Sequence, residues 1–309
     1  MEVIILGCGS AIPTAERNPS GQLLAFPDAS YLIDCAEGTQ IRIIQEKART
    51  KFLKAIFISH LHGDHYLGLM GLLWSLDLAG RTKPLTLVSP KGLSEIMEVQ
   101  LRHANSSLSF PLIHLELEPE TSESVFLDEN ISVRAFPLKH GVPCFGFRFN
   151  EHPKRRKFRK DAIDRYRLSP EQIRKALNGE QLLKRNGDVI ENNDLFHPEA
   201  KLRSYSYCTD TLPADFALKE INESSLLYHE ATYDSSKQEI AKKRFHSTAQ
   251  EAAQVAKAAK VGQLVIGHYS SRYKKVDLLL KEAKTEFENT ICAHDGLIIP
   301  INLEVLKLQ

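Results

Sequence analysis

Four potential metal ligands fall within six consecutive positions close to residue 60. Residues 59–65 read Ser-His-Leu-His-Gly-Asp-His, which brings His60, His62, Asp64 and His65 together in the sequence. Imidazole nitrogens and a carboxylate are ligands that zinc accepts, and a cluster this dense can serve two ions. A histidine-rich surface turn is the plain alternative, but such tracts are usually of low complexity and this one is not.

The residues on either side of this cluster predict its place in a fold. A short apolar run of the buried-strand type, Ala-Ile-Phe-Ile-Ser, occupies 55–59. Apolar residues then recur at helical spacing over 66–78. The ligands are therefore expected on a loop between the carboxyl end of a strand and a helix, where α/β folds place their sites.

Strand-like and helical patterns alternate over most of the chain. Strands are expected at 3–6, 23–26, 31–34, 56–59, 85–88, 131–137, 225–229 and 264–267. Helices are expected at 39–46, 66–78, 91–103, 248–259 and 276–287, with Ser247 as the cap before 248. The alternation predicts an α/β fold, and the hairpin-like strands near the start favour mixed rather than purely parallel sheets.

Length and composition restrict the class of protein. The 309 residues, 42% of them hydrophobic, suffice for a globular fold with a sizeable core. The longest apolar stretch, 67–76, is too short for a membrane span, and the first residues lack the basic region of a signal peptide, so a cytoplasmic protein is expected. Five scattered cysteines without a C-x-x-C pair indicate reduced, mostly buried thiols, and Cys208 fits a core residue better than a ligand.

Positive charge is concentrated in one segment. The chain carries a net charge of +1, yet residues 153–175 hold ten basic side chains against three acidic ones. This +7 segment leaves −6 for the rest. The surrounding stretch 151–198 has few apolar residues and turn signals at 178–179 and 186–187, and Ser169-Pro170-Glu171 predicts a helix over 170–177. We interpret 151–198 as an arm inserted into the domain; a merely solvated charged loop is the alternative.

Further motifs run along the whole chain. They are GCGSAIPTAERN at 7–18, DCAEGTQ at 34–40, PLKH at 137–140 followed by VPCFG at 142–146, TDT at 209–211, HEAT at 229–232, HST at 246–248 and GHYSSRY at 267–273. Together with HLHGDH at 60–65 they resemble, in order, the motifs of ribonuclease Z, the tRNA 3′ processing endonucleases of the metallo-β-lactamase superfamily. Ala36 replaces a glycine of that pattern, and Ala15 stands where some members have a lysine.

The resemblance implies a fold and a metal centre. The fold would be the αβ/βα four-layer sandwich with two mixed β-sheets, one domain over 1–309 from which the basic arm 151–198 extends as an exosite. The glycine-proline-rich tip of that arm is missing here. Two zinc ions per chain are implied, one held by His60, His62 and His140, the other by Asp64, His65 and His268, with Asp210 bridging them.

The resemblance also implies an activity and its residues. The protein would be a zinc phosphodiesterase that removes the 3′ trailer from precursor tRNA by water attack and leaves a 3′-hydroxyl. Asp64 would act as general base, and Glu230 with His246 as proton donor. Substrate contacts would come from Arg17, Asn18, Ser270, Ser271 and Arg272 near the metals and from Lys154, Arg155, Arg156 and Lys157 on the arm. A homodimer and no membrane partner are expected.

Two other classes of function remain open at this point. Another binuclear hydrolase of the superfamily, such as a phosphodiesterase or a small-ester hydrolase, would have no need for both the basic arm and the HST motif. An RNA-binding protein with an inactive domain would have lost metal ligands. All seven ligand positions hold ligand-type residues in this chain, which favours the nuclease.

Overall fold

The chain folds into two compact units in the computed structural model, which describes residues 1–48, 50–153, 157–184, 186–197, 200–213, 217–302 and 304–305. The larger unit combines Met1–Asn150 with Arg203–Ile301, and the smaller combines Glu151–Leu202 with Asn302–Gln309. In the described ranges, no helix is long and apolar enough to cross a membrane.

The first sheet of the larger unit has seven strands in the order β17-β1-β2-β3-β4-β5-β6. They are β1 (Glu2–Gly7), β2 (Gly21–Ala25), β3 (Ser30–Cys35), β4 (Leu53–Phe57), β5 (Leu85–Pro90), β6 (Leu112–Leu117) and β17 (Ile298–Pro300). Pairing is antiparallel from β17 to β3 and parallel from β3 to β6, so the sheet is mixed, as predicted.

The second sheet also has seven strands, in the order β16-β15-β14-β13-β9-β8-β7. They are β7 (Glu123–Leu127), β8 (Ile131–Leu138), β9 (Cys144–Glu151), β13 (Ser204–Cys208), β14 (Leu226–Glu230), β15 (Leu264–Gly267) and β16 (Thr290–Cys292). Strands β13 to β16 pair in parallel, whereas β9 runs antiparallel to β13 and β7 antiparallel to β8. This sheet is therefore mixed as well.

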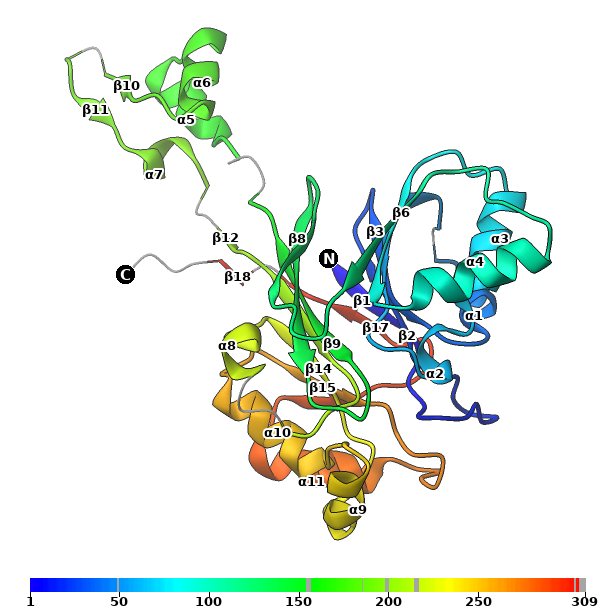
Figure 1. The fold of residues 1–309 in the computed structure, drawn as a ribbon. Helices are drawn as coiled ribbons and strands as arrows, with labels where there is room; N and C mark the ends of the chain where they lie inside the picture. Colours follow the sequence, from blue (N-terminus) through cyan, green and yellow to red (C-terminus); the bar gives the residue numbers. More distant parts are fainter. Residues whose placement is uncertain are drawn as a thin grey trace. The chain divides into compact units, whose positions relative to one another are not determined.

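The two sheets pack face to face because both faces of the first sheet are apolar. On β1, Val3 and Ile5 join a core cluster with Phe145 and Phe147 of β9, while Ile4 and Leu6 join a separate cluster on the opposite face. Side chains alternate along a strand, so a continuous apolar run supplies both faces. Burial on both faces is what makes β1 an inner element of a layered structure (Figure 1).

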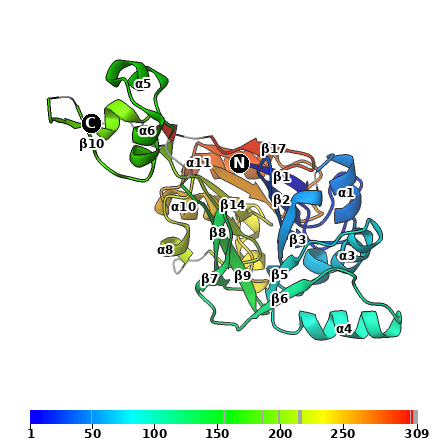
Figure 2. The same ribbon diagram turned by 90° about the horizontal axis from the view of Figure 1, so that it is seen from above.

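Helices form the outer layers of the larger unit. The outer face of the first sheet packs against α1 (Thr39–Gln45), α3 (Leu69–Leu78) and α4 (Leu93–His103). The second sheet carries α10 (Ala249–Ala258) and α11 (Asp277–Glu286), on the side away from α1, α3 and α4 (Figure 2). Shorter helices are α2 (Gly63–Tyr66), α8 (Leu218–Ile221) and α9 (Gln238–Lys243). The predicted four-layer sandwich is confirmed.

The smaller unit contains the predicted arm and has a core of its own. Its elements are α5 (Lys160–Tyr166), α6 (Pro170–Leu177), β10 (Leu182–Leu183), β11 (Val189–Ile190), α7 (Asn192–Leu195), β12 (Ala200–Lys201) and β18 (Glu304–Val305). Leu168, Leu182, Ile190, Leu195 and Phe196 form the centre of a small buried cluster. A capping box between Ser169 and Gln172 starts α6, and the predicted helix 170–177 is confirmed.

Two predicted helix boundaries are wrong. The helix expected over 66–78 is divided: α2 ends at Tyr66, and the amide of Gly68 donates to the carbonyl of Cys35 before α3 starts at Leu69. A Cβ at Gly68 would lie 1.9 Å from the Ala36 carbonyl oxygen, so this close approach requires glycine. The second error concerns Ser247: the cap of α10 is Thr248, which forms a capping box with Glu251.

Candidate metal centre

The HLHGDH motif follows directly from the parallel part of the first sheet. Strand β4 ends at Phe57, and His60 and His62 lie on the connection that leaves it. The expectation that all four ligands occupy a loop is wrong in one respect, because α2 begins at Gly63 inside the motif. Asp64 and His65 therefore lie on one short helical turn, which directs both side chains toward the same edge of the sheets.

Three more predicted ligands arrive from the second sheet, each just beyond the end of a strand. His140 follows β8, which ends at Leu138; Asp210 follows β13, which ends at Cys208; and His268 comes immediately after β15. Distant sequence positions meet here because strand ends gather at one edge of a sheet. His60, His65, Asp210 and His268 are all buried.

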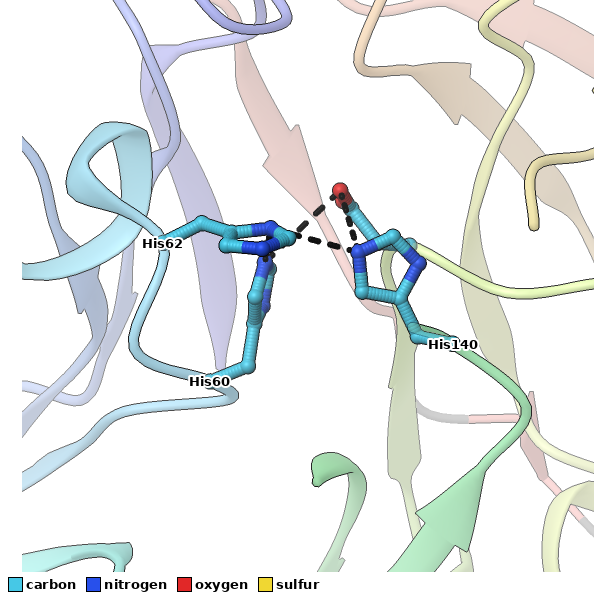
Figure 3. A group of neighbouring side chains, drawn as sticks. His60, His62 and His140 are labelled. Carbon is cyan, nitrogen blue, oxygen red and sulfur yellow. Dashed lines mark hydrogen bonds and ion pairs between the residues drawn. The ribbon is translucent and has the colours of Figure 1, made fainter. Parts of the chain in front are cut away.

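His60, His62 and His140 point toward one another and toward a carboxylate (Figure 3). The Nδ1 atom of His62 lies 3.1 Å from Nε2 of His60 and 3.2 Å from Nε2 of His140. Oδ2 of Asp210 lies 3.7 Å from each of the two Nε2 atoms. Atoms bound tetrahedrally at about 2.0–2.1 Å from one zinc ion would be about 3.3 Å apart, so this spacing suits a shared metal ion.

Asp64, His65 and His268 form a second set around the other oxygen of Asp210. Nε2 of His65 and Nε2 of His268 lie 3.4 Å and 3.2 Å from Asp210 Oδ1, and each lies 3.6 Å from Asp64 Oδ2. The carboxylate of Asp210 thus faces one set of ligands with Oδ2 and the other with Oδ1. This is the arrangement that a bridging ligand requires.

Unsatisfied nitrogens show that the second set fits a metal ion. Among the described residues, Nε2 of His65 and Nε2 of His268 are buried without a hydrogen-bond partner. Buried polar atoms normally have hydrogen-bond partners, and a missing partner is often an ion.

The pKa of His60, in the first set, is lowered well below its usual value, first by burial and then by the neighbouring His65. This favours the neutral imidazole that binds metal. The His/Asp cluster is therefore suited to divalent metal ions.

Asp34 orients His65 of the second set by a contact to the ring nitrogen that faces away from the other ligands. Its Oδ2 lies 2.7 Å from Nδ1 of His65 and accepts from the hydroxyls of Tyr207 and Ser59 at 2.7 Å and 2.9 Å, while Oδ1 accepts from the Ser59 amide at 2.7 Å. A proton on Nδ1 of His65 leaves Nε2 free to bind a metal. Asp34 has a positive φ of 55°, a rare conformation for a residue other than glycine.

Glu230 and His246 form a pair next to the predicted metal ligands. Nδ1 of His246 lies 2.8 Å from Oε1 of Glu230, which is fully buried and also accepts from the amides of Thr211 and Thr232. Burial favours neutral His246, but the Glu230 carboxylate outweighs it and raises the pKa of His246 to about 9. The rings of His246 and His268 lie 5.6 Å apart, so the pair borders the second set.

The hydroxyl of Thr232 connects this pair to a metal ligand. Oγ1 of Thr232 donates to Oε2 of Glu230 at 2.6 Å and lies 3.1 Å from Nδ1 of His268. A proton on Nδ1 of His268 can be donated to the same hydroxyl, which fixes the tautomer with Nε2 toward the second set. One side chain therefore contacts both the predicted ligand His268 and the Glu230–His246 pair.

The end of α9 fixes the backbone at His246. The amide of His246 donates to the carbonyl of Ala241 at 2.9 Å, and the amide of Phe245 donates to the carbonyl of Lys242 at 3.2 Å. This hydrogen-bond pattern is a Schellman motif, in which Phe245 takes the left-handed position with φ 58°. The carbonyl of Phe245 also lies 3.1 Å from Nδ1 of His140 and so holds a ligand of the first set.

The first-loop residues expected to contact substrate have partners within the protein. Arg17 is buried, donates to the carbonyl of Tyr273 and lies over the ring of Tyr269. Both the amide and the side chain of Asn18 donate to Oδ2 of Asp295, at 2.7 Å and 2.8 Å. These contacts fix the loop on which the Ala11 amide donates to Oδ2 of Asp64 at 2.7 Å.

The remaining residues predicted to contact substrate lie in the GHYSSRY motif and on the arm, and the structure describes only some of them. Ser271 and Arg272 are exposed near the second set, and Nε of Arg272 donates to the hydroxyl of Ser270 at 3.0 Å. Lys157 is exposed on the smaller unit. Lys154, Arg155 and Arg156 lie outside the described residues. A role in substrate binding remains a prediction for all of them.

The cysteines occupy the environments that composition suggested. All five are free thiols, and Cys208 is buried in the main core, where burial raises its pKa. A buried protonated thiol is a poor metal ligand.

The sequence did not identify Asp34 and Thr232 as residues that orient the predicted ligands, although both lie within the motifs DCAEGTQ and HEAT. Their position in those motifs was the available signal.

Comparisons with known proteins agree with this geometry. A family model described as anti-Pycsar protein Apyc1 matches residues 1–154, a little under half of the chain. Ribonuclease Z of Bacteroides fragilis is 39% identical over 300 residues, 97% of this chain and 99% of the relative. Ribonuclease Z of Cytophaga hutchinsonii is 39% identical over 96% of this chain and 94% of its own length.

Solved structures lead to the same family. Human tRNase Z, short form, superimposes with a TM-score of 0.70 at 26% identity and covers 98% of this chain and 100% of its own. The metallo-β-lactamase fold protein YhfI from Bacillus subtilis reaches 0.68 at 18% identity, covering 96% and 97%, a likeness of fold alone. Near-complete alignment with curated relatives, together with this fold, shows that the chain belongs to the ribonuclease Z family of metallo-β-lactamase fold proteins.

Proposed function

We propose that this protein is a zinc-dependent endoribonuclease that removes the 3′ trailer from precursor tRNA and leaves a 3′-hydroxyl on the tRNA. The observation that carries the proposal is the convergence of the two ligand sets and the Glu230–His246 pair at one sheet edge, in a member of the ribonuclease Z family. A structure-only likeness to other hydrolases would not identify the substrate.

Seven residues would hold two zinc ions. His60, His62 and His140 make up one set and Asp64, His65 and His268 the other, with Asp210 shared between them. When bound, such ions lower the pKa of attacking water and neutralise charge on the phosphate. Asp64 accepts the proton that the water loses, because its carboxylate faces the second set and the Ala11 amide fixes its orientation through Oδ2.

His246 donates the proton that the leaving ribose 3′ oxygen needs. Nδ1 of His246 is paired with the Glu230 carboxylate, so the Nε2–H of His246 is the group that can donate to the leaving oxygen. With a pKa of about 9, the imidazolium form is populated at neutral pH. Without a protonated leaving oxygen the phosphodiester bond breaks slowly, since an alkoxide is a poor leaving group.

The smaller unit would bind tRNA away from the cut. Seven of the ten basic residues of 153–175 lie in the described ranges; they are Lys157, Arg159, Lys160, Arg165, Arg167, Arg174 and Lys175. Contacts to phosphates supply affinity without reading base sequence.

We further propose that the protein is cytoplasmic and forms a homodimer, in which one subunit's arm presents tRNA to its partner's metal site. Mixing arm-deleted chains with metal-site mutants should then restore part of the cleavage.

Cleavage of one labelled precursor tRNA tests the proposal directly. The purified protein should cut at the trailer junction and release a tRNA with a 3′-hydroxyl, and a chelator should stop the reaction. A protein that hydrolyses a small phosphodiester but leaves the precursor uncut would instead be another hydrolase of the superfamily.

A single substitution tests the proton donor. His246→Ala should retain metal and RNA binding and lose roughly a hundredfold to ten-thousandfold in single-turnover rate. A precursor with a better leaving group should recover part of that loss. His103→Ala, at an exposed histidine of α4, is the matched control and should cleave normally. A near-normal rate for His246→Ala would remove this residue from the mechanism.

A further inference from the structure

Phe245 is the single exposed Phe, Tyr or Trp side chain in the part of the chain that the structure describes, with 43% of its surface accessible. It comes immediately before His246, and a Cβ at Gly141 would lie 3.9 Å from its ring. Gly141 itself follows the predicted ligand His140. The exposed ring therefore stands at the border of the metal centre.

The backbone conformation at Phe245 is strained for a residue that carries a side chain. It occupies the left-handed position of the Schellman motif at the end of α9, with φ 58°, a position that glycine fills without strain. An exposed ring gains little from burial to offset that strain. Residues held in strained backbone conformations cluster at functional sites, and here the hydrogen bonds of the Schellman motif hold Phe245.

The neighbouring residues indicate what kind of ligand the ring meets. Lys242, Lys243 and Arg244 precede it, and all three are exposed. An aromatic face beside cations is the combination with which proteins bind unpaired nucleotides, since bases stack on the ring and phosphates contact the cations. The three residues directly before the ring are all cations, which suits phosphates better than an apolar protein surface.

We propose that Phe245 is a stacking platform for the base of the last nucleotide that stays on the tRNA, with Lys242, Lys243 and Arg244 close to the adjoining phosphates. This assignment rests on the proposed function. His246 protonates the 3′ oxygen of the last retained ribose, so the residue beside His246 is next to the base of the same nucleotide. The platform thereby positions the scissile bond.

Four variants and three RNAs test the platform. Phe245→Tyr keeps an aromatic face, Phe245→Leu keeps apolar bulk without one, and Phe245→Gly removes the side chain at a position that suits glycine. Base stacking on an aromatic residue contributes enough that Phe245→Leu and Phe245→Gly should lower kcat/KM on precursor tRNA by about fivefold to 150-fold, whereas Phe245→Tyr should stay within about twofold. Leu127→Ala, at an exposed residue of β7, is a control for loss of surface apolar area.

A structural role is separated from stacking by stability and metal content. Phe245→Gly should unfold at an equal or higher urea concentration than the wild type, because it relieves the left-handed strain. Bound metal should stay at the wild-type level in every variant, since the carbonyl that holds His140 is retained. A fall in bound metal that accounts for the loss of cleavage would overturn the proposal.

Modified precursors identify the nucleotide. An abasic site at the last retained position should cost the wild type the same factor and leave Phe245→Leu with no further loss. An abasic site at the first trailer position should preserve the difference between the two proteins. Equal kcat/KM for wild type and Phe245→Leu on unmodified precursor, or a difference that disappears with the trailer abasic site, would refute the assignment.

Failure of the proposed function looks different from failure of this inference. If the wild type leaves the unmodified precursor uncut, the proposed function is wrong. The platform is then judged by tRNA affinity: weaker binding by Phe245→Leu supports it, and equal binding overturns it.

Discussion

The pair formed by Glu230 and His246 makes stability depend on pH in a predictable direction. Nδ1 of His246 lies 2.8 Å from the Glu230 carboxylate, and its pKa is raised from 6.5 to about 9 although burial opposes the charge. The folded protein therefore holds a proton on His246 more tightly than the unfolded chain does. This difference in proton affinity is a contribution to the free energy of unfolding.

The size of this contribution follows from the pKa difference. Each unit corresponds to about 1.4 kcal/mol, so a shift from 6.5 to about 9 gives about 3 kcal/mol. Because the folded-state pKa is the higher one, the full stabilisation is present below the unfolded pKa of 6.5 and is lost as pH rises through about 9. The contribution should therefore disappear on the alkaline side, between those two values.

Urea unfolding of chelator-treated wild type and His246→Asn measures this loss. The difference between their free energies of unfolding should shrink by about 3 kcal/mol from about pH 6 to about pH 10. Comparing two proteins cancels the titration of other groups, and metal-free protein keeps bound cations from altering His246. His103→Asn should track the wild type at every pH. A difference that stays constant, or that grows as pH rises, would refute the assigned ion pair.

Three more changes probe the metal centre and the arm. Wild-type protein should contain close to two zinc ions by elemental analysis, and Asp210→Asn should lose both at once, since its two oxygens face both sets; loss of one ion alone would contradict the bridge. Thr232→Val should weaken metal retention against a competing chelator by roughly 10-fold to 100-fold, whereas Thr232→Ser should retain it, and equal retention by both would exclude the hydroxyl. Replacing 152–201 with a short glycine-serine linker should spare the larger unit's fold and flatten the salt dependence of tRNA affinity by about 0.9 for each duplex phosphate that the arm neutralises. Hydrolysis of a small chromogenic phosphodiester should survive that deletion, and equal loss of both substrates would mean that the arm supports the active site.

Local patterns determined most of the elements that carry the site. Strands β1, β3, β5 and β15 and helices α4 and α6 agree with the predicted spans within two residues, because apolar periodicity and capping residues act over short distances. The strand at β13 was not predicted, although its alternation of serine and tyrosine is a strand pattern, one in which the serines would be expected to face solvent. Ser206 is nonetheless buried, because its hydroxyl pairs with that of Ser224 at 2.7 Å. That partner is visible only in the folded chain.

The sequence by itself determined which residues were available for chemistry: four ligand-type residues within 60–65, and motif positions for His140, Asp210 and His268. Only the tertiary structure decided that the two oxygens of Asp210 face different ligand sets and that Asp34 and Thr232 orient His65 and His268. The physical reason is the range of the interactions. Periodicity and capping depend on neighbours a few residues away, whereas the orientation of a buried imidazole depends on which distant strand end supplies the group that accepts its proton.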